Sequence, residues 1–201
     1  MPTCDVSIIA LGRDLSNARL QRVMRSLKDE QITFEVFTKR GGRVQRVIGA
    51  WIVPWRAKGK VLFTPDPESA ISISYISKLR RKKWVADVRE DYKLLIEDRA
   101  WATGIKKVLG NLIADWAVSS SASADLTIVV DDWVKPITAK NRIVIHNAPD
   151  IRFLPEPSDW DKNPRAIYVG DVRNSRGLFS MLRAIEMTDD WSLDIVGNIA
   201  Q

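Results

Sequence analysis

The chain contains 201 residues, of which 45% are hydrophobic and 28% charged, a balance that suits a globular protein with one full core and part of another. No apolar run reaches the roughly 18–20 residues of a spanning helix, and the N-terminus lacks the basic head and long apolar core of a signal peptide. One cysteine and one histidine exclude an internal disulfide framework, argue against a metal site built by the protein and fit a reducing compartment. We therefore expect a cytoplasmic protein.

The net charge of +6 is unevenly distributed along the chain. Residues 1–150 contain 25 Lys/Arg and 17 Asp/Glu, whereas residues 151–201 contain 6 Lys/Arg and 8 Asp/Glu. A basic first part indicates a polyanionic neighbour, which anionic lipid, nucleic acid or a phosphorylated substrate would each satisfy. Because no nucleic-acid-binding motif accompanies the charge, we do not expect a nucleic-acid partner.

Short apolar runs alternate with helical patterns through the first 150 residues. The runs are rich in β-branched residues, which is typical of buried parallel strands. The predicted strands span residues 6–11, 32–38, 61–64, 84–88, 126–130 and 142–146. Apolar spacing and helix-start signals predict helices over 20–27, over 44–51 with Pro54 as its end, from Pro67 to the basic stretch 78–83, and over 96–123. This alternation predicts an α/β fold around a parallel sheet.

A proline-rich and polar stretch over 154–164 predicts a linker that separates a second α/β unit from the first. After the linker, the pattern predicts a strand over 167–169, a helix over 178–185 and a strand over 193–196. A strand–helix–strand segment of this length is a parallel crossover unit. We therefore predict a first domain over 1–153 and the incomplete beginning of a second over 165–201.

The turn between the first strand and the helix of this second unit contains glycines and arginines. Gly170 ends the strand, Arg173 and Arg176 follow, and Gly177 precedes the helix. Open α/β sheets bind ligands at the carboxyl ends of their strands, and arginines beside a helix N-terminus can hold a phosphate. The turn therefore predicts a diphosphate site, which Asp171 opposes unless its carboxylate pairs with an arginine. Two solvated arginines in a surface turn are the alternative.

Residues 165–197 resemble the opening of the second domain of GT-B glycosyltransferases, most closely the family called GT4. That family places a glycine-arginine pair after the strand and a lysine-glycine pair at the start of the helix. Here the first pair is Gly170-Asp171, which departs from the pattern, and the second is Arg176-Gly177, which keeps the charge. Three earlier segments resemble the family in the right order, at 84–92, 124–130 and 143–150.

The resemblance implies two Rossmann-like domains, an acceptor-side domain followed by a donor-binding one. It implies retaining transfer of a sugar, of the hexosyltransferase kind, from a nucleotide-diphosphate sugar to a hydroxyl of a carbohydrate, lipid-linked or small-molecule acceptor. It implies no cofactor and no metal, because cationic side chains and helix dipoles offset the leaving diphosphate. The second domain of the family is longer than residues 165–201, so we expect a fragment that is inactive by itself.

The turn after the strand 84–88 carries the candidate catalytic residues Arg89, Glu90 and Asp91. The family often has a histidine facing the sugar where this chain has Arg89. Glu90 or Asp91 could act as a hydrogen-bonding base at the carboxyl end of the strand. The alternative is a charged loop that caps the next helix.

Gly12, Arg13 and Asp66 are the candidate acceptor or cleft residues of the first domain. Glycine after the first strand lets the backbone approach a ligand, although an ordinary turn explains it nearly as well. Helix capping explains Asp66 at least as well as a cleft position does. The G-x-G-x-x-G fingerprint of dinucleotide binding is absent. We expect His146, the single histidine, to be a structural residue held by a hydrogen bond.

Basic residues over 19–28 and 80–83, together with Trp51, Trp55 and Trp84, form a candidate patch for peripheral contact with the inner membrane face. A solvated face with core tryptophans is the alternative.

Two other functions stay open beside sugar transfer. A non-catalytic GT-B relative would act as a binding or scaffold partner. A different Rossmann-like nucleotide-sugar enzyme, such as an epimerase, would bind its ligand at Gly12 and not near Arg173 and Arg176.

Overall fold

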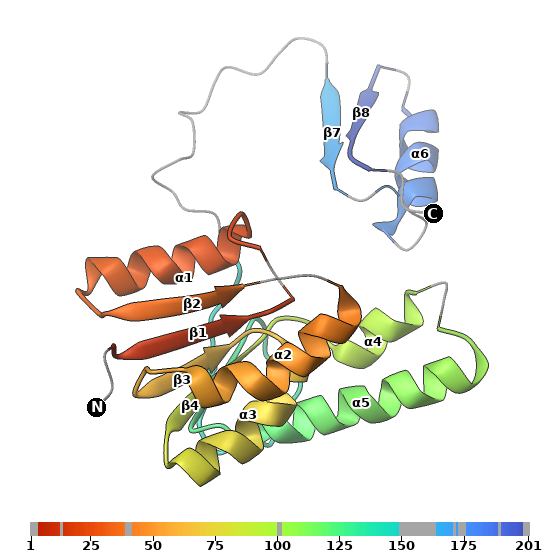
Figure 1. Cartoon of the computed structure of the whole chain (residues 1–201). Coiled ribbons are helices and arrows are strands. Elements are labelled where there is room, and N and C mark those ends of the chain that lie inside the picture. The colour runs from red at the N-terminus through yellow and green to blue at the C-terminus, as the bar shows by residue number, and fades with distance from the viewer. Residues whose placement is uncertain are drawn as a thin grey trace. The chain divides into compact units, whose positions relative to one another are not determined.

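Six parallel strands form the centre of the first of two units in the computed structural model of this chain (Figure 1). The structure describes residues 4–12, 14–38, 42–99, 102–148, 164–170, 172, 176–188 and 190–198. The chain divides into Met1–Ala148 and Pro149–Gln201, and each unit is described by itself. The predicted domain boundary was residue 153, and most of the predicted linker lies outside the described residues.

The strand order in the first unit is β2-β1-β3-β4-β5-β6, and every neighbouring pair is parallel. The prediction of a Rossmann-like α/β fold is therefore confirmed. The chain moves outward from β1 in both directions, so the topological switch point lies between β1 and β3. The strands are β1 (Val6–Ala10), β2 (Phe34–Thr38), β3 (Val61–Thr64), β4 (Lys83–Val88), β5 (Leu126–Val129) and β6 (Arg142–Val144).

Helices cover the two faces of the sheet unequally. The first unit contains α1 (Ala18–Asp29), α2 (Arg43–Arg56), α3 (Pro67–Arg80), α4 (Tyr92–Glu97) and α5 (Gly104–Ala122). Helix α1 lies on one face, whereas α2, α3 and α5 lie side by side on the other (Figure 1). Much of one face is thus covered by three adjacent helices, and the opposite face carries a single described helix.

Alternate strand residues supply a core on each face of the sheet. On the α1 face, Ile8 and Phe63 pack with Leu20. On the face of the sheet covered by α2, α3 and α5, Ile9 and Trp84 belong to the larger core, and Trp84 is only 2% exposed. Burial of this apolar surface is the main favourable term that holds the helices on the sheet.

Helix α2 continues through Pro54 to Arg56, so the prediction that Pro54 ends this helix is wrong. Proline has no N–H to donate to the carbonyl four residues earlier, which here belongs to Ala50. The hydroxyl of Ser72 in α3 donates to that carbonyl at 2.5 Å. A side chain from the neighbouring helix therefore replaces the missing backbone hydrogen bond.

The long helical region predicted over 96–123 is mostly helical but is not continuous, because α4 ends at Glu97 and α5 begins at Gly104. The backbone N–H of Arg99 donates to the carbonyl of Ile96 in a tighter turn, which stops α4. Gly104 has φ +50°, a conformation that favours glycine and starts the new helix in a different direction.

The second unit has the predicted parallel strand–helix–strand arrangement. It contains β7 (Arg165–Val169), α6 (Leu178–Glu186) and β8 (Ser192–Val196), with β7 and β8 parallel. The two backbone segments that follow β7 and β8 stay close together, since a Cβ at position 197 would lie 1.7 Å from the carbonyl oxygen of Gly170. Glycine is therefore required at Gly197 for the carboxyl ends of β7 and β8 to meet in this way.

Candidate functional site

The carboxyl ends of β1 and β3 meet at the switch point, where Gly12 and Asp66 are joined. The Gly12 N–H donates to Oδ2 of Asp66 at 2.7 Å, and a Cβ on Gly12 would lie only 2.9 Å from Oδ1. Asp66 occupies the capping position of α3, but its side chain makes no capping hydrogen bond among the described residues. Asp66 therefore lies directly before α3, as the capping explanation has it, but its carboxylate binds the amide that was expected to face a ligand.

A buried carboxylate bound by two arginines lies beside this point, at the end of β4. Asp87 is 2% exposed and accepts from Arg19 of α1 through Nε at 3.2 Å and Nη2 at 2.6 Å. Arg89 donates to the same carboxylate through Nε at 3.0 Å and to Asn17 Oδ1 through Nη1 at 3.3 Å. Asn17 also caps α1 by accepting from the N–H of Leu20. Two arginines and one carboxylate leave this cluster cationic.

The predicted catalytic residues Arg89, Glu90 and Asp91 have three different surroundings. Arg89 is bound to Asp87, and Glu90 is exposed. Asp91 caps α4, because its carboxylate accepts from the N–H groups of Lys93 at 2.9 Å and Leu94 at 3.2 Å. The geometry thus favours the capping alternative for Asp91 and leaves Glu90 as the exposed carboxylate of this turn.

Tyr92 is buried near the carboxylates of Asp66 and Asp87. Burial is the largest influence on its phenol and raises the pKa, and the negative charges of Asp66 and Asp87 raise the pKa further. The phenol therefore stays protonated at neutral pH and can serve as a hydrogen-bond donor but not as a base.

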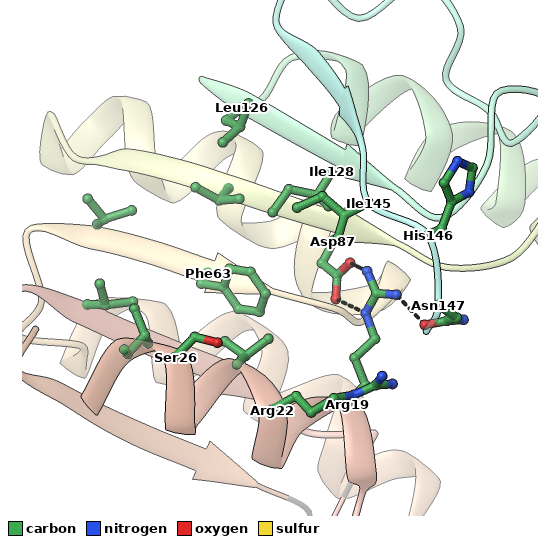
Figure 2. Close-up of a pocket in the computed structure, with 15 residues that line it drawn as sticks. Arg19, Arg22, Ser26, Phe63, Asp87, Leu126, Ile128, Ile145, His146 and Asn147 are labelled. Carbon is green, nitrogen blue, oxygen red and sulfur yellow. Dashed lines mark hydrogen bonds and ion pairs between the residues drawn. The ribbon is translucent and has the colours of Figure 1, made fainter. Parts of the chain in front are cut away.

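A pocket of about 440 Å³ lies between α1 and the open face of the sheet (Figure 2). Its interior is lined by apolar side chains of α1 and of the central strands, including Leu27, Phe63, Val85 and Ile128. Figure 2 shows that one end is polar, where Arg19, Arg22, Asp87, His146 and Asn147 gather.

The polar end of the pocket is built from residues far apart in sequence. Arg19 Nη1 donates to Asn147 Oδ1 at 2.6 Å, and Arg22 donates to the carbonyl of Ala148. Nδ1 of His146 lies 3.0 Å from the carbonyl oxygen of Val130, the kind of hydrogen bond expected of a structural histidine. Sequence reasoning missed Arg19 and Asn147 as site residues. The available signal was that Asn147 follows β6 at the sheet edge that β1 and β4 also reach.

The predicted phosphate turn of the second unit is described only in part. The Gly170 N–H donates to the carbonyl of Val196 at 3.0 Å. Arg176 is exposed directly before Gly177, which occupies the N-cap position of α6 with φ +76°. Arg173 and Asp171 lie outside the described residues, as does Arg13 of the first unit.

The predicted membrane patch does not form one surface. Trp84 is buried in the core, and the basic helix α1 lies on the opposite face of the sheet from Trp51 and Trp55 of α2 (Figure 1). Within the described part of the chain, none of the helices combines the length and apolar character needed to cross a membrane. The same residues include no cluster of His, Cys, Asp and Glu side chains that could hold a metal ion.

Comparisons with known proteins add little to this geometry. No protein-family model matches the chain, and neither does any curated protein sequence. The chain is similar to dTDP-4-dehydrorhamnose reductase from Bacillus anthracis str. Ames, solved in complex with NADP, with a TM-score of 0.40 and 12% identity over 98% of this chain and 75% of that one. A likeness this low carries no argument about function, and the fold assignment depends on the sheet topology itself.

Proposed function

We propose that the chain carries the acceptor-side domain of a GT-B-type glycosyltransferase, followed by a strand–helix–strand unit of its donor-binding domain. In this proposal a sugar passes from a nucleotide-diphosphate sugar to an acceptor hydroxyl. The observation that carries the proposal is the succession of two separate parallel α/β units in one chain, the second opening with β7, α6 and β8. The family resemblance of the sequence supports the same order of domains.

The start of α6 has the chemistry that donor binding requires. Arg176 and the first N–H groups of α6 lie together at the carboxyl side of the crossover, where a diphosphate gains from both the guanidinium and the helix dipole. The same groups would offset the negative charge of the leaving diphosphate during transfer. This role for Arg176 asks for no metal ion.

The first unit offers an acceptor site in the pocket beside α1. Its apolar interior suits an acceptor with a hydrophobic part, and its polar end offers donors and acceptors for hydroxyl groups. Glu90 is the exposed carboxylate of the adjoining turn and is our candidate for a hydrogen bond to the acceptor hydroxyl.

A dinucleotide-dependent nucleotide-sugar enzyme is the second candidate, and the first turn of the sheet argues against it. Such an enzyme would place its pyrophosphate at the turn after β1. Here the Gly12 amide already donates to Asp66, and that carboxylate would repel a pyrophosphate. The observation favours sugar transfer over a dinucleotide-dependent reaction.

The test is calorimetric titration of the protein with UDP, GDP, ADP and NADP. We expect one nucleoside diphosphate to bind, and Arg176→Ala to weaken its affinity about tenfold through loss of a charge-assisted hydrogen bond. Arg183→Ala, in the last turn of α6, is the matched control and should leave the affinity unchanged.

Each of the other outcomes favours a different function. Binding of NADP alone would favour the dinucleotide-dependent enzyme. Absence of binding by all four nucleotides would favour the non-catalytic scaffold and overturn our proposal.

A further inference from the structure

Helix α2 turns its small residues toward the protein and its large apolar residues toward solvent, the reverse of an ordinary amphipathic helix. Its small residues Gly49 and Ala50 face the protein, and Ala50 is 1% exposed. Its large apolar residues recur at helical spacing on the outside and are 42% to 72% exposed. These outward residues are Val44, Val47, Ile48, Trp51, Ile52 and Trp55.

Helix α5 repeats this arrangement. Gly110, Ala114 and Ala117 face the protein, and a Cβ on Gly110 would contact Ile96 of α4 at 3.3 Å. The large apolar side chains again lie outside, with exposed fractions of 46% to 75%. They are Ile105, Val108, Leu109, Leu112, Ile113 and Trp116. Burial against this unit therefore does not explain why these residues are apolar.

Tyr75 of α3 joins the two helices into one apolar surface. Its ring lies 6.4 Å from that of Trp51 in α2 and 6.4 Å from that of Trp116 in α5, measured between ring centroids. We call the outward side of α2, α3 and α5 the three-helix face. A contiguous apolar patch that extends over three helices is the kind of exposed surface that marks a binding site.

Positive charge accompanies the three-helix face. Helices α2, α3 and α5 together contain seven Lys/Arg and two Asp/Glu. The basic residues cluster towards the helix ends, with Arg56 ending α2, Lys78 near the end of α3 and Lys106 near the start of α5. These three side chains are exposed and form no ion pair within the described residues.

We propose that the three-helix face docks this protein onto an anionic membrane surface. Exposed tryptophans and aliphatic side chains would enter the boundary between headgroups and acyl chains, while the lysines and arginines at the helix ends bind the headgroups. A second copy of the chain fits less well, because pairing two such faces would bring like charges together, and lysine is depleted in protein interfaces. The inference is independent of sugar transfer, since it concerns a surface that contains none of the candidate site residues.

The first experiment measures sedimentation of the full chain with vesicles of phosphatidylcholine alone or of phosphatidylcholine mixed with phosphatidylglycerol. We expect binding to the mixed vesicles, and a partition that falls about tenfold for Ile48→Glu, which puts a negative charge within the apolar surface. Ile137→Glu is the matched control, because Ile137 is 64% exposed but lies in the loop between β5 and β6. It should bind as the unaltered chain does.

A second measurement needs no variant and guards against misfolding of Ile48→Glu. Phosphatidylglycerol vesicles with brominated acyl chains should quench the fluorescence of the exposed tryptophans of the three-helix face, Trp51, Trp55 and Trp116. Equal binding to neutral and anionic vesicles, or an absence of quenching, would overturn the proposal. So would a dimer in sedimentation velocity that Ile48→Glu dissociates while vesicle binding is absent.

Discussion

Asp87 holds together three segments that are far apart in the sequence. Its carboxylate accepts hydrogen bonds from Arg19 of α1 and from Arg89 after β4, and Arg19 continues to Asn147 after β6. A buried carboxylate with two guanidinium partners is stable only while every charge keeps its partner. The cluster therefore holds the polar end of the pocket in place, and loss of any one of its charged side chains should destabilise the protein.

We predict that Asp87→Ala lowers the free energy of unfolding by about 3–5 kcal/mol, because it leaves two largely buried arginines without their carboxylate. Urea denaturation followed by circular dichroism measures the change. Glu90→Ala, three residues along and exposed, should stay within about 0.5 kcal/mol of the unaltered chain. Equal losses of unfolding free energy for the two substitutions would show that the Asp87 cluster does not stabilise the fold more than an exposed carboxylate does.

Glu35 on β2 supplies a pH dependence. Burial is the largest single influence and raises its pKa, but hydrogen bonds from Ser7 and from the backbone of Lys58 and Gly59 together outweigh it, so the pKa is lowered from its ordinary value. A carboxyl group whose pKa falls on folding stabilises the protein above its unfolded pKa and loses this contribution as the pH decreases.

We therefore predict that the urea midpoint falls more steeply between pH 6 and pH 3.5 in the unaltered chain than in Glu35→Gln, with the pH range chosen to span an ordinary carboxyl pKa of about 4.3. Glu90→Gln supplies the control for removal of one exposed carboxylate. A pH profile that is identical for the unaltered chain and for Glu35→Gln would contradict the prediction.

At the scale of the element, α2 shows how a neighbouring helix can change the effect of a local sequence signal. Pro54 predicts a helix end because it cannot donate to the carbonyl of Ala50, but Ser72 of α3 donates to that carbonyl. This supporting contact is long-range, so no local window of sequence contains it. The error in predicting the end of α2 therefore has a single identifiable cause.

We predict that Ser72→Ala costs about 1–3 kcal/mol of unfolding free energy, since it leaves the buried carbonyl of Ala50 without its donor. In a Pro54→Ala background the same substitution should cost less, because a backbone N–H is then available for that carbonyl. The double-mutant cycle in urea denaturation measures the coupling. Strictly additive effects would refute the exchange of one donor for another.

Strands were easier to predict from the sequence than the exposed faces of helices. The runs around Ile8 and Val85 are apolar on both sides of the chain, which fits a parallel sheet buried on both faces. Helical spacing indicated helices in the regions of α2 and α5 but misplaced the end of α2 and the start of α5, and it could not say which side of each helix faces the core. Gly49 and Ala114 face inward because small residues allow close helix packing, and this leaves the large residues outside.

The sequence predicted only those residues of the candidate site that lie in a single turn directly after a strand. Glu90 and Arg176 are exposed in turns at the carboxyl side of their strands, as their positions after a strand suggested. Arg19 was not expected there, because it reaches Asp87 across 68 residues and depends on how α1 lies on the sheet. The pocket itself arises from the packing of α1 against β1, β3, β4 and β5, and sequence periodicity does not encode the distance between the helix and the sheet.

At the scale of the whole molecule, the two units differ in their capacity to bury a core. The first contains all six strands of its sheet and a core on each face. The described residues of the second form two strands and one helix, and no residue of α6 is buried. Two strands and a short helix give too little apolar burial to offset the conformational entropy lost on folding.

We therefore predict that a protein of residues 1–148 unfolds cooperatively by itself, whereas one of residues 149–201 has no cooperative transition, as measured by thermal denaturation in circular dichroism. A protein of residues 1–125 is the control, because it lacks β5 and with it the fully buried Thr127 and Val129. It should fail to fold, since the larger core and the pocket wall are then open to water. Cooperative unfolding of residues 149–201 alone would mean that the second unit has a source of stability that its described residues do not supply.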